Sequence, residues 1–416
     1  MRLPNPPVPF PTGKGVTHLK TSMFFHVAEL LDTRREFPLP RREGVRGWAM
    51  LEHLVRGSVR AIDPYAWELS SEAVAARHGL RMRDVIRFDL NTSPLPPASW
   101  DAAMEAARAE GQPNEYFDTS YAELAALFAA YYGVGTDNLI IGAGADEILD
   151  ITTKTFLDNG DRVVVSVPTY SMYPIVSEQM GATVQRVPLN ADFAPDIDGI
   201  LAAAQGAKII WHCNPNSPTG NATDPAAMER LIADAPCIVV VDEAYAEYVG
   251  WSAVPLIARY PHLIVVRTMS KAFGMAGMRL ACGIATPDVI GMMNRVRPPN
   301  SVSRVTARVG AAALRDIPAM RANVAAVIAQ REPFADALWE IGAHVYPSVT
   351  NFLLTRWENP AIAQSVYEFL EARGMVVRNF SSHPLLPGHL RITVRTADEN
   401  ARLLAALKEW REQRER

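Results

Sequence analysis

The middle of the chain alternates short apolar segments with amphipathic ones, and this alternation restricts the fold more than any other feature. The apolar segments are rich in β-branched residues, which favour strands. They lie at 138–141, 162–167, 183–187, 208–211, 237–241, 263–267 and 280–284. Helical patterns lie between several of them, for example at 146–157 and 225–233. Near-continuous apolar strands that alternate with helices predict the α/β class, with a mostly parallel seven-stranded sheet covered by helices.

The pattern changes on both sides of this region. At 416 residues the chain is long enough for two or three domains. Long helical stretches at 303–314 and 319–341 precede strands at 352–355 and 390–394. We therefore expect a large domain at 113–300 and a smaller α+β domain at 301–416, with 61–112 as its N-terminal part. Within that part, Ser70 opens a helix that Gly79 ends. The Pro-rich start of residues 1–60 suggests an N-terminal arm.

Composition and charge exclude several classes of function. The net charge of −4 disfavours a general nucleic-acid-binding protein. The sequence has no run of 18 apolar residues, and its first residues lack the apolar region of a secretory signal. Cys213, Cys237 and Cys282 are widely spaced, which indicates reduced thiols and neither disulfides nor a metal site. We expect a cytoplasmic protein without a metal and without a nucleic-acid or membrane partner.

Polar clusters follow four of the predicted strands at the point where each strand ends. They occupy 142–147, 214–220, 242–245 and 268–271. Ligands of open α/β sheets bind beyond the carboxyl ends of the strands, so these clusters mark a candidate site. A dinucleotide is disfavoured because Glu147 stands where the third glycine of the GxGxxG fingerprint belongs. A nucleoside triphosphate is disfavoured because the sequence has no GxxxxGK[ST].

The residue types in these clusters suit pyridoxal 5'-phosphate (PLP). A lysine such as Lys271 can form a Schiff base with an aldehyde cofactor when nearby cationic or apolar groups lower its pKa. Asp242, at the end of an apolar strand, can keep the ring nitrogen of such a cofactor protonated. A phosphate can be held by amides at a helix N-terminus and a fixed cation. The candidates for the phosphate are the amides of Ala145 and Asp146, with Ser270 and Arg279.

The order of these motifs along the chain resembles that of the fold-type I aminotransferases. The segments that carry the resemblance are 144–147, 168–173, 216–220, 242–245 and 270–273, followed by Arg279. Within that superfamily the chain is most similar to the histidinol-phosphate aminotransferases, over roughly 61–410. The resemblance implies a homodimeric PLP enzyme of histidine biosynthesis. It would move an amino group between histidinol phosphate, or a related amino substrate, and 2-oxoglutarate or glutamate.

The resemblance also implies roles around the cofactor. Tyr170 would stack on the ring, Asp242 would pair with the ring nitrogen, and Tyr245 would bond the phenolic oxygen. Lys271 would carry the cofactor and then move a proton between the substrate Cα and the cofactor carbon. Arg279, with Ser270 and the amides of Ala145 and Asp146, would hold the phosphate.

Three further residues are expected on the substrate side. Tyr116 would reach into the partner subunit's site, the alternative being a core aromatic of its own subunit. Arg391 would bind a substrate carboxylate as a bidentate pair. Arg378 would help to bind the substrate phosphate, unless it is a solvated charge at a strand end.

The chain departs from the family pattern in two motifs. Ser217 stands where the family has Asn, so either Asn216 or Ser217 would bond the phenolic oxygen of the cofactor. Residues 90–94 read Leu-Asn-Thr-Ser-Pro where the family has Asn-Glu-Asn-Pro. These differences keep two alternatives of the same fold open: an aromatic amino-acid aminotransferase and a PLP-dependent amino-acid-phosphate decarboxylase. A regulator with a DNA-binding arm at 1–60 is disfavoured, because the arm lacks helix-turn-helix spacing and Lys271 is retained.

Overall fold

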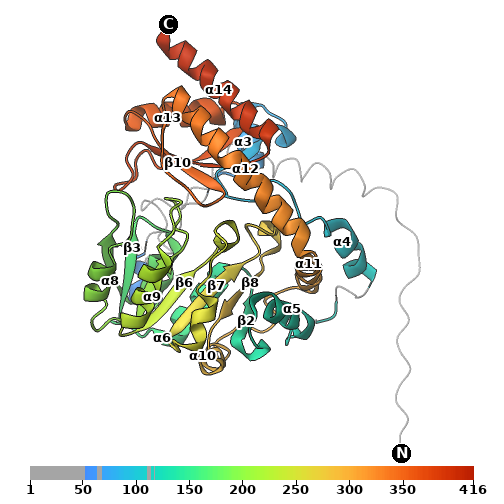
Figure 1. Ribbon diagram of the computed structural model, residues 1–416, viewed down its shortest axis with the longest axis vertical. Helices are drawn as coiled ribbons and strands as arrows, with labels where there is room; N and C mark the ends of the chain where they lie inside the picture. The colour runs from blue at the N-terminus through green and yellow to red at the C-terminus, as the bar shows by residue number, and fades with distance from the viewer. Residues whose placement is uncertain (1–51, 63–67, 110–113, 117) are drawn as a thin grey trace, which may run out of the picture. The chain divides into compact units, whose positions relative to one another are not determined.

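The computed structural model describes residues 52–62, 68–109, 114–116 and 118–416 (Figure 1). The chain divides into two units, Met1–Leu54 and Val55–Arg416. The first unit contributes the 3-10 helix η1 (Glu52–Leu54). The rest of the arm predicted for 1–60, as far as residue 51, lies outside the described residues.

Seven strands of the second unit form the predicted sheet. Their order across the sheet is β2-β8-β7-β6-β5-β3-β4. The bounds are β2 Leu139–Gly142, β3 Arg162–Val167, β4 Thr183–Pro188, β5 Ile209–Cys213, β6 Ile238–Asp242, β7 Leu263–Thr268 and β8 Ala281–Ile284. All neighbours are parallel except β8, which is antiparallel to both β2 and β7. The α/β prediction is confirmed, and each strand lies within two residues of its predicted range.

Helices cover both faces of this sheet, and alternate residues of each strand face opposite ways. In β3, Val163 and Val165 pack into one apolar cluster with helices α6 (Ala145–Phe156), α7 (Met172–Gln179) and α10 (Pro287–Met293). Val164 packs into the other cluster. That cluster holds α5 (Ala122–Tyr132), α8 (Ile197–Ala203) and α9 (Pro225–Asp234). Burial on both faces explains the near-continuous apolar runs of the sequence.

A second, five-stranded sheet has the order β1-β11-β12-β10-β9. Its bounds are β1 Ile86–Phe88, β9 His344–Val345, β10 Phe352–Arg356, β11 Met375–Asn379 and β12 His389–Thr393. β1 is parallel to β11, and the other pairs are antiparallel. The sequence predicted β10 and β12 but not β1, β9 or β11. The short β1 brings the chain that precedes the large sheet into this second sheet.

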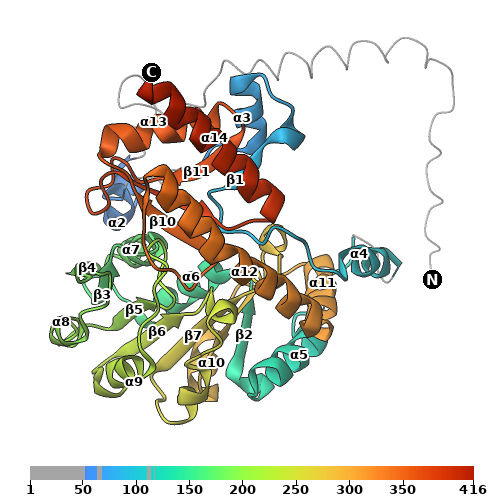
Figure 2. The same cartoon turned by 45° about the horizontal axis from the view of Figure 1, so that its top comes forward.

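The remaining helices are α2 (Gly57–Arg60), α3 (Ser71–His78), α4 (Trp100–Ala109), α11 (Arg304–Arg315), α12 (Ile317–Ile341), α13 (Pro360–Glu371) and α14 (Ala397–Glu415). α3 begins and ends as predicted: the Ser70 side chain accepts from the amide of Ala73, and Gly79 ends it in the left-handed conformation. The long α12 runs from α11 to α14 and contacts β9 and β10 on the way (Figures 1 and 2). It therefore joins the two sheets. No helix of the described ranges combines the length and apolar character that crossing a membrane requires.

Helix α11 packs against the segment that connects β7 to β8. A Cβ added to Gly310 would lie 2.3 Å from Leu280 Cδ2. Leu280 is fully buried. The absence of a side chain at Gly310 therefore lets the helix approach the connection closely.

We expect Gly310→Ala to lower the free energy of unfolding by about 1–2 kcal/mol, because overpacking outweighs the gain in helix propensity. Gly291→Ala in α10 is the matched control, since a Cβ there meets nothing within 4 Å. That variant should be stabilised by up to about 1 kcal/mol. Denaturant unfolding measures both variants, and a stabilised Gly310→Ala would contradict the packing.

Candidate active site

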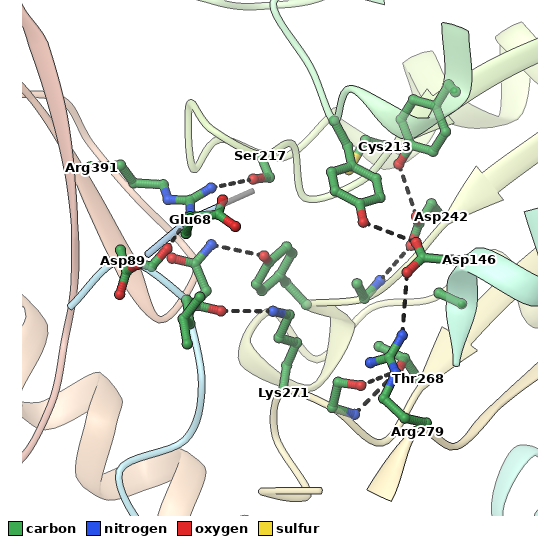
Figure 3. A pocket seen from close by; sticks show the side chains of 18 residues that line it. Glu68, Asp89, Asp146, Cys213, Ser217, Asp242, Thr268, Lys271, Arg279 and Arg391 are labelled. Atoms are coloured by element: carbon green, nitrogen blue, oxygen red, sulfur yellow. Dashed lines mark hydrogen bonds and ion pairs between the residues drawn. The ribbon is translucent and has the colours of Figure 1, made fainter. Parts of the chain in front are cut away.

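A cavity of about 240 Å³ lies at the carboxyl edge of the large sheet (Figure 3). Most of the residues predicted for the site line it. They are Ala145, Asp146, Tyr170, Ser217, Asp242, Tyr245, Ser270, Lys271, Arg279 and Arg391. Figure 3 shows Asp146, Asp242 and Arg279 on one side of the cavity, with Arg391, Glu68 and Asp89 on the other.

The strand directions explain why these residues meet. Parallel strands β2, β3, β5, β6 and β7 all end at this edge. β8 runs the opposite way, so Arg279, two residues before it begins, lies at the same edge. The second sheet supplies Arg391 from β12, and Asp89 and Asn91 from the chain that follows β1.

Asp242 is a buried carboxylate at the end of β6. Its Oδ1 accepts from the amide of Ala244 at 3.1 Å, and its Oδ2 accepts from the Tyr173 hydroxyl at 2.9 Å. Burial raises the pKa of Asp242 to about 6, while the hydrogen bonds from Tyr173 and Ala244 oppose this rise. The Tyr173 ring is held by stacking on Trp211, with ring centroids 5.6 Å apart. A cation placed beside this carboxylate would offset the cost of burying it.

Lys271 lies across the cavity from Asp242. Its Nζ donates to the Leu90 carbonyl at 3.0 Å and lies 5.8 Å from the centre of the Tyr245 ring. Burial lowers the pKa of Lys271 to about 8, and the positive charges of Arg391 and Arg279 add to the effect. An amine with such a pKa is largely neutral in mildly alkaline solution and can act as a nucleophile or a base.

The end of the cavity near Arg279 has the features of an anion site. Helix α6 points its N-terminus there, and its first residues are Ala145 and Asp146. Gly144 has a φ of +89°, and a Cβ at that position would lie 2.5 Å from Arg279 Nη2. Glycine is therefore required for the close approach of this arginine. The Asp146 carboxylate accepts from Arg279 at 3.2 Å and from the Tyr170 hydroxyl at 2.9 Å.

The opposite end of the cavity is organised by Arg391. Its guanidinium donates to Ser217 Oγ at 3.0 Å and to the Asp89 carbonyl at 2.6 Å. Asn91 Nδ2 donates to the Tyr245 hydroxyl at 2.9 Å. Burial raises the pKa of Tyr245, so its hydroxyl keeps its proton and can donate it in a hydrogen bond.

Three predicted residues do not line the cavity. The Asn216 side chain donates to the Pro168 carbonyl, in the segment after β3, at 3.0 Å and to Thr219 Oγ1 in its own loop at 2.7 Å. Of the two residues left open, Ser217 therefore faces the cavity. Arg378 forms an ion pair with Glu68, which itself lines the cavity. Tyr116 is 89% exposed, so it is not a core aromatic of its own subunit.

Eight residues that line the cavity were given no individual role from the sequence, although several of them lie in segments that the sequence had marked. They are Glu68, Asp89, Leu90, Asn91, Tyr173, Cys213, Ala244 and Thr268. Tyr173 belongs to the 168–173 motif, and its place in that motif is the signal that could have identified it. Glu68 follows no predicted strand, and no sequence signal identified it.

The fold and this site define a family of enzymes. The family model for class I and II aminotransferases matches residues 83–407. The chain belongs to this family.

Curated relatives that match over most of the chain are histidinol-phosphate aminotransferases. The relative from Roseiflexus castenholzii is 34% identical over 369 residues, covering 87% of this chain and 99% of its own length. The relative from Caldanaerobacter subterraneus subsp. tengcongensis is 38% identical, covering 71% and 84% of the two chains. The reaction of the family transfers an amino group from a donor to an oxo-acid acceptor.

Solved structures agree on the fold. The histidinol-phosphate aminotransferase from Sinorhizobium meliloti, in complex with PLP, superposes with a TM-score of 0.79 at 24% identity. It covers 86% of this chain and 98% of that one. Thermus thermophilus aspartate aminotransferase with maleate gives a TM-score of 0.72 at 23% identity, over 86% and 99% of the two chains.

The charges around Lys271 make a prediction about its titration. In cofactor-free protein, Lys271 should react with an amine reagent with a midpoint near pH 8. Arg279→Gln removes a cation and should raise this midpoint, whereas Asp146→Asn removes an anion and should lower it. Peptide mass spectrometry measures the pH profile, with exposed Lys408 as an internal reference. A wild-type midpoint near the ordinary 10.5 would contradict the electrostatics of the cavity.

Proposed function

We propose that this aminotransferase uses PLP and exchanges an amino group between histidinol phosphate and 2-oxoglutarate or glutamate. One observation carries the proposal: Lys271, Asp242 and Arg279 converge on one cavity at the carboxyl edge of the sheet. The substrate is suggested by the names of the curated relatives. A related amino substrate would use the same chemistry.

The cavity has the groups that PLP requires. When bound, PLP supplies an electron sink for the negative charge that develops at the substrate Cα. Arg279, Ser270 and the amides of Ala145 and Asp146 would hold its phosphate. The close approach of Arg279 to Gly144 supports this phosphate site, because it places the guanidinium beside the N-terminus of α6, where the helix dipole is also positive.

Asp242 would keep the ring nitrogen protonated. A carboxylate with a pKa of about 6 in a buried position is stabilised by a neighbouring cation, so a protonated ring nitrogen and an ionised Asp242 favour each other. Tyr173 would position Asp242 through its hydrogen bond at 2.9 Å. The Tyr170 ring would stack on the cofactor ring.

Lys271 would carry the cofactor and, when released, would move a proton to and from the substrate Cα. Its lowered pKa of about 8 suits both roles, because the neutral amine is accessible near physiological pH. The Tyr245 hydroxyl, which Asn91 orients, would donate to the phenolic oxygen. Ser217 faces the cavity and would assist there, while Asn216 holds the loop.

Substrate recognition would involve the two arginines of the second sheet. Arg391 would form a bidentate pair with the carboxylate of glutamate or 2-oxoglutarate. Arg378 stands directly opposite Arg391 in the register of β11 and β12 and would bind the substrate phosphate. An aromatic amino-acid aminotransferase or an amino-acid-phosphate decarboxylase would share the cofactor residues and differ at this end.

We further propose that the enzyme is a homodimer in which Tyr116 reaches the partner's site. The high exposure of Tyr116 supports this, since tyrosine is enriched at protein–protein interfaces. Mixing Lys271→Ala and Tyr116→Ala protomers should restore part of the activity in heterodimers. Heterodimers that form without any recovery would contradict a shared site.

The substrate assignment makes a second prediction. Arg391→Lys should raise KM for glutamate about 10- to 100-fold, because an ammonium cannot form the bidentate pair, and should affect histidinol phosphate less. Arg378→Ala should raise KM for histidinol phosphate and leave glutamate nearly unaffected. Separate half-reactions, followed by the absorbance of the cofactor, measure each substrate.

Equal losses on both substrates in both variants would show that the arginines act on folding or closure. Turnover of unphosphorylated aromatic amino acids with none of histidinol phosphate would contradict the substrate assignment. The aminotransferase reaction itself would stand in that case.

A further inference from the structure

Glu68 is an acidic residue of the cavity that has no part in the proposed chemistry. Its carboxylate forms an ion pair with Arg378, and the two side chains are 27% and 28% exposed. Figure 3 shows Glu68 beside Arg391, at the end of the cavity assigned to the substrate. A carboxylate therefore occupies the position next to the arginine that would bind a substrate phosphate.

The register of the second sheet gives a reason for this ion pair. Arg378 and Arg391 are direct partners across β11 and β12. Like charges that face each other across two strands destabilise a sheet. The negative charge of Glu68 thus offsets the repulsion between the two arginines while no anionic substrate is present.

The two partners of the ion pair differ in how firmly the backbone holds them. β11 lies inside the sheet, between β1 and β12, and Arg378 is in its regular part. Glu68 lies in neither a helix nor a strand, two residues before Ser70, the N-cap of α3. When the pair separates, we expect Glu68 to move and Arg378 to stay.

We propose that Glu68 is a specificity-determining residue, a built-in counter-anion of Arg378 that a phosphate-bearing substrate must displace. The inference rests on the proposed function of Arg378. A phosphate monoester carries a charge of about −1.5 to −2 and three acceptor oxygens, so it competes with a carboxylate for the guanidinium. Glutamate pairs one of its two carboxylates with Arg391, and its other carboxylate, with a single negative charge, competes for Arg378 less well than a phosphate does. Glu68 therefore weakens the binding of every anion at Arg378 and leaves phosphate as the group best able to compete.

The test is the isosteric variant Glu68→Gln, examined as the holoenzyme so that the cofactor already fills its own phosphate site. Removing the competing charge should lower KM for histidinol phosphate and Ki for inorganic phosphate. The expected change is about two- to fivefold, the range for an ion pair that is partly exposed. KM for glutamate should change less, so that the ratio of the two KM values shifts.

Glu72→Gln is the matched control. Glu72 lies four residues further along the same segment, in the first turn of α3, and is exposed. The Glu72→Gln substitution removes the same charge as Glu68→Gln but lies outside the cavity. It should therefore leave unchanged the ratio of the KM values for histidinol phosphate and glutamate, and the Ki for inorganic phosphate. An equal shift in this variant would assign the effect to net charge and overturn the proposal.

A second readout does not depend on turnover. Inorganic phosphate should raise the thermal midpoint of Glu68→Gln holoenzyme more than that of wild type, because no internal anion competes.

A higher KM for histidinol phosphate in Glu68→Gln would mean that Glu68 orients Arg378 for the substrate, and unchanged values would mean that it plays no part. Either result overturns the proposal. If wild type does not turn over histidinol phosphate at all, the proposed substrate fails, and the inorganic phosphate measurements still decide the role of Glu68.

Discussion

The buried carboxylate of Asp242 is the feature on which the rest of the site depends. It ends an apolar strand in the middle of the sheet, and burial, with a smaller contribution from the charges of Asp146 and Glu243, raises its pKa to about 6. Two hydrogen bonds, from Tyr173 and Ala244, oppose this rise without removing it. A cation that binds beside this buried carboxylate stabilises the folded protein, because it offsets the cost of burying the negative charge. The position of Asp242 in the sheet therefore favours a ligand with a positively charged group.

The other charges of the cavity are arranged around that carboxylate. Arg279 and Arg391 stand at opposite ends, and Lys271 lies between them. The positive charge of each arginine adds to burial in lowering the pKa of the lysine. The two groups that would anchor anions therefore also keep the lysine reactive. Binding and reactivity at this site have a common electrostatic origin.

The sequence predicted the large sheet well because its strands are buried on both faces and read as continuous apolar runs. It also located Asp242, which ends one such run, and Lys271, which lies three residues after the end of β7. It could not predict contributions that depend on how the second sheet folds back. The sequence marked residues 90–94 only as a departure from the family motif. Leu90 and Asn91 reach the cavity through the three-residue strand β1, which is too short to show a pattern. Glu68 matters only because β11 places Arg378 beside it. The choice between Asn216 and Ser217 depended on the direction of two side chains in one loop.

The central claim is that Lys271 binds the cofactor covalently, opposite Asp242. Borohydride reduction of the holoenzyme, followed by peptide mass spectrometry, tests it most directly, because reduction makes the bond between an amine and an aldehyde cofactor permanent. One modified peptide is expected, with the mass of the reduced cofactor on Lys271, and none in Lys271→Ala. A modification at another lysine, in wild type or in that variant, would contradict the role of Lys271.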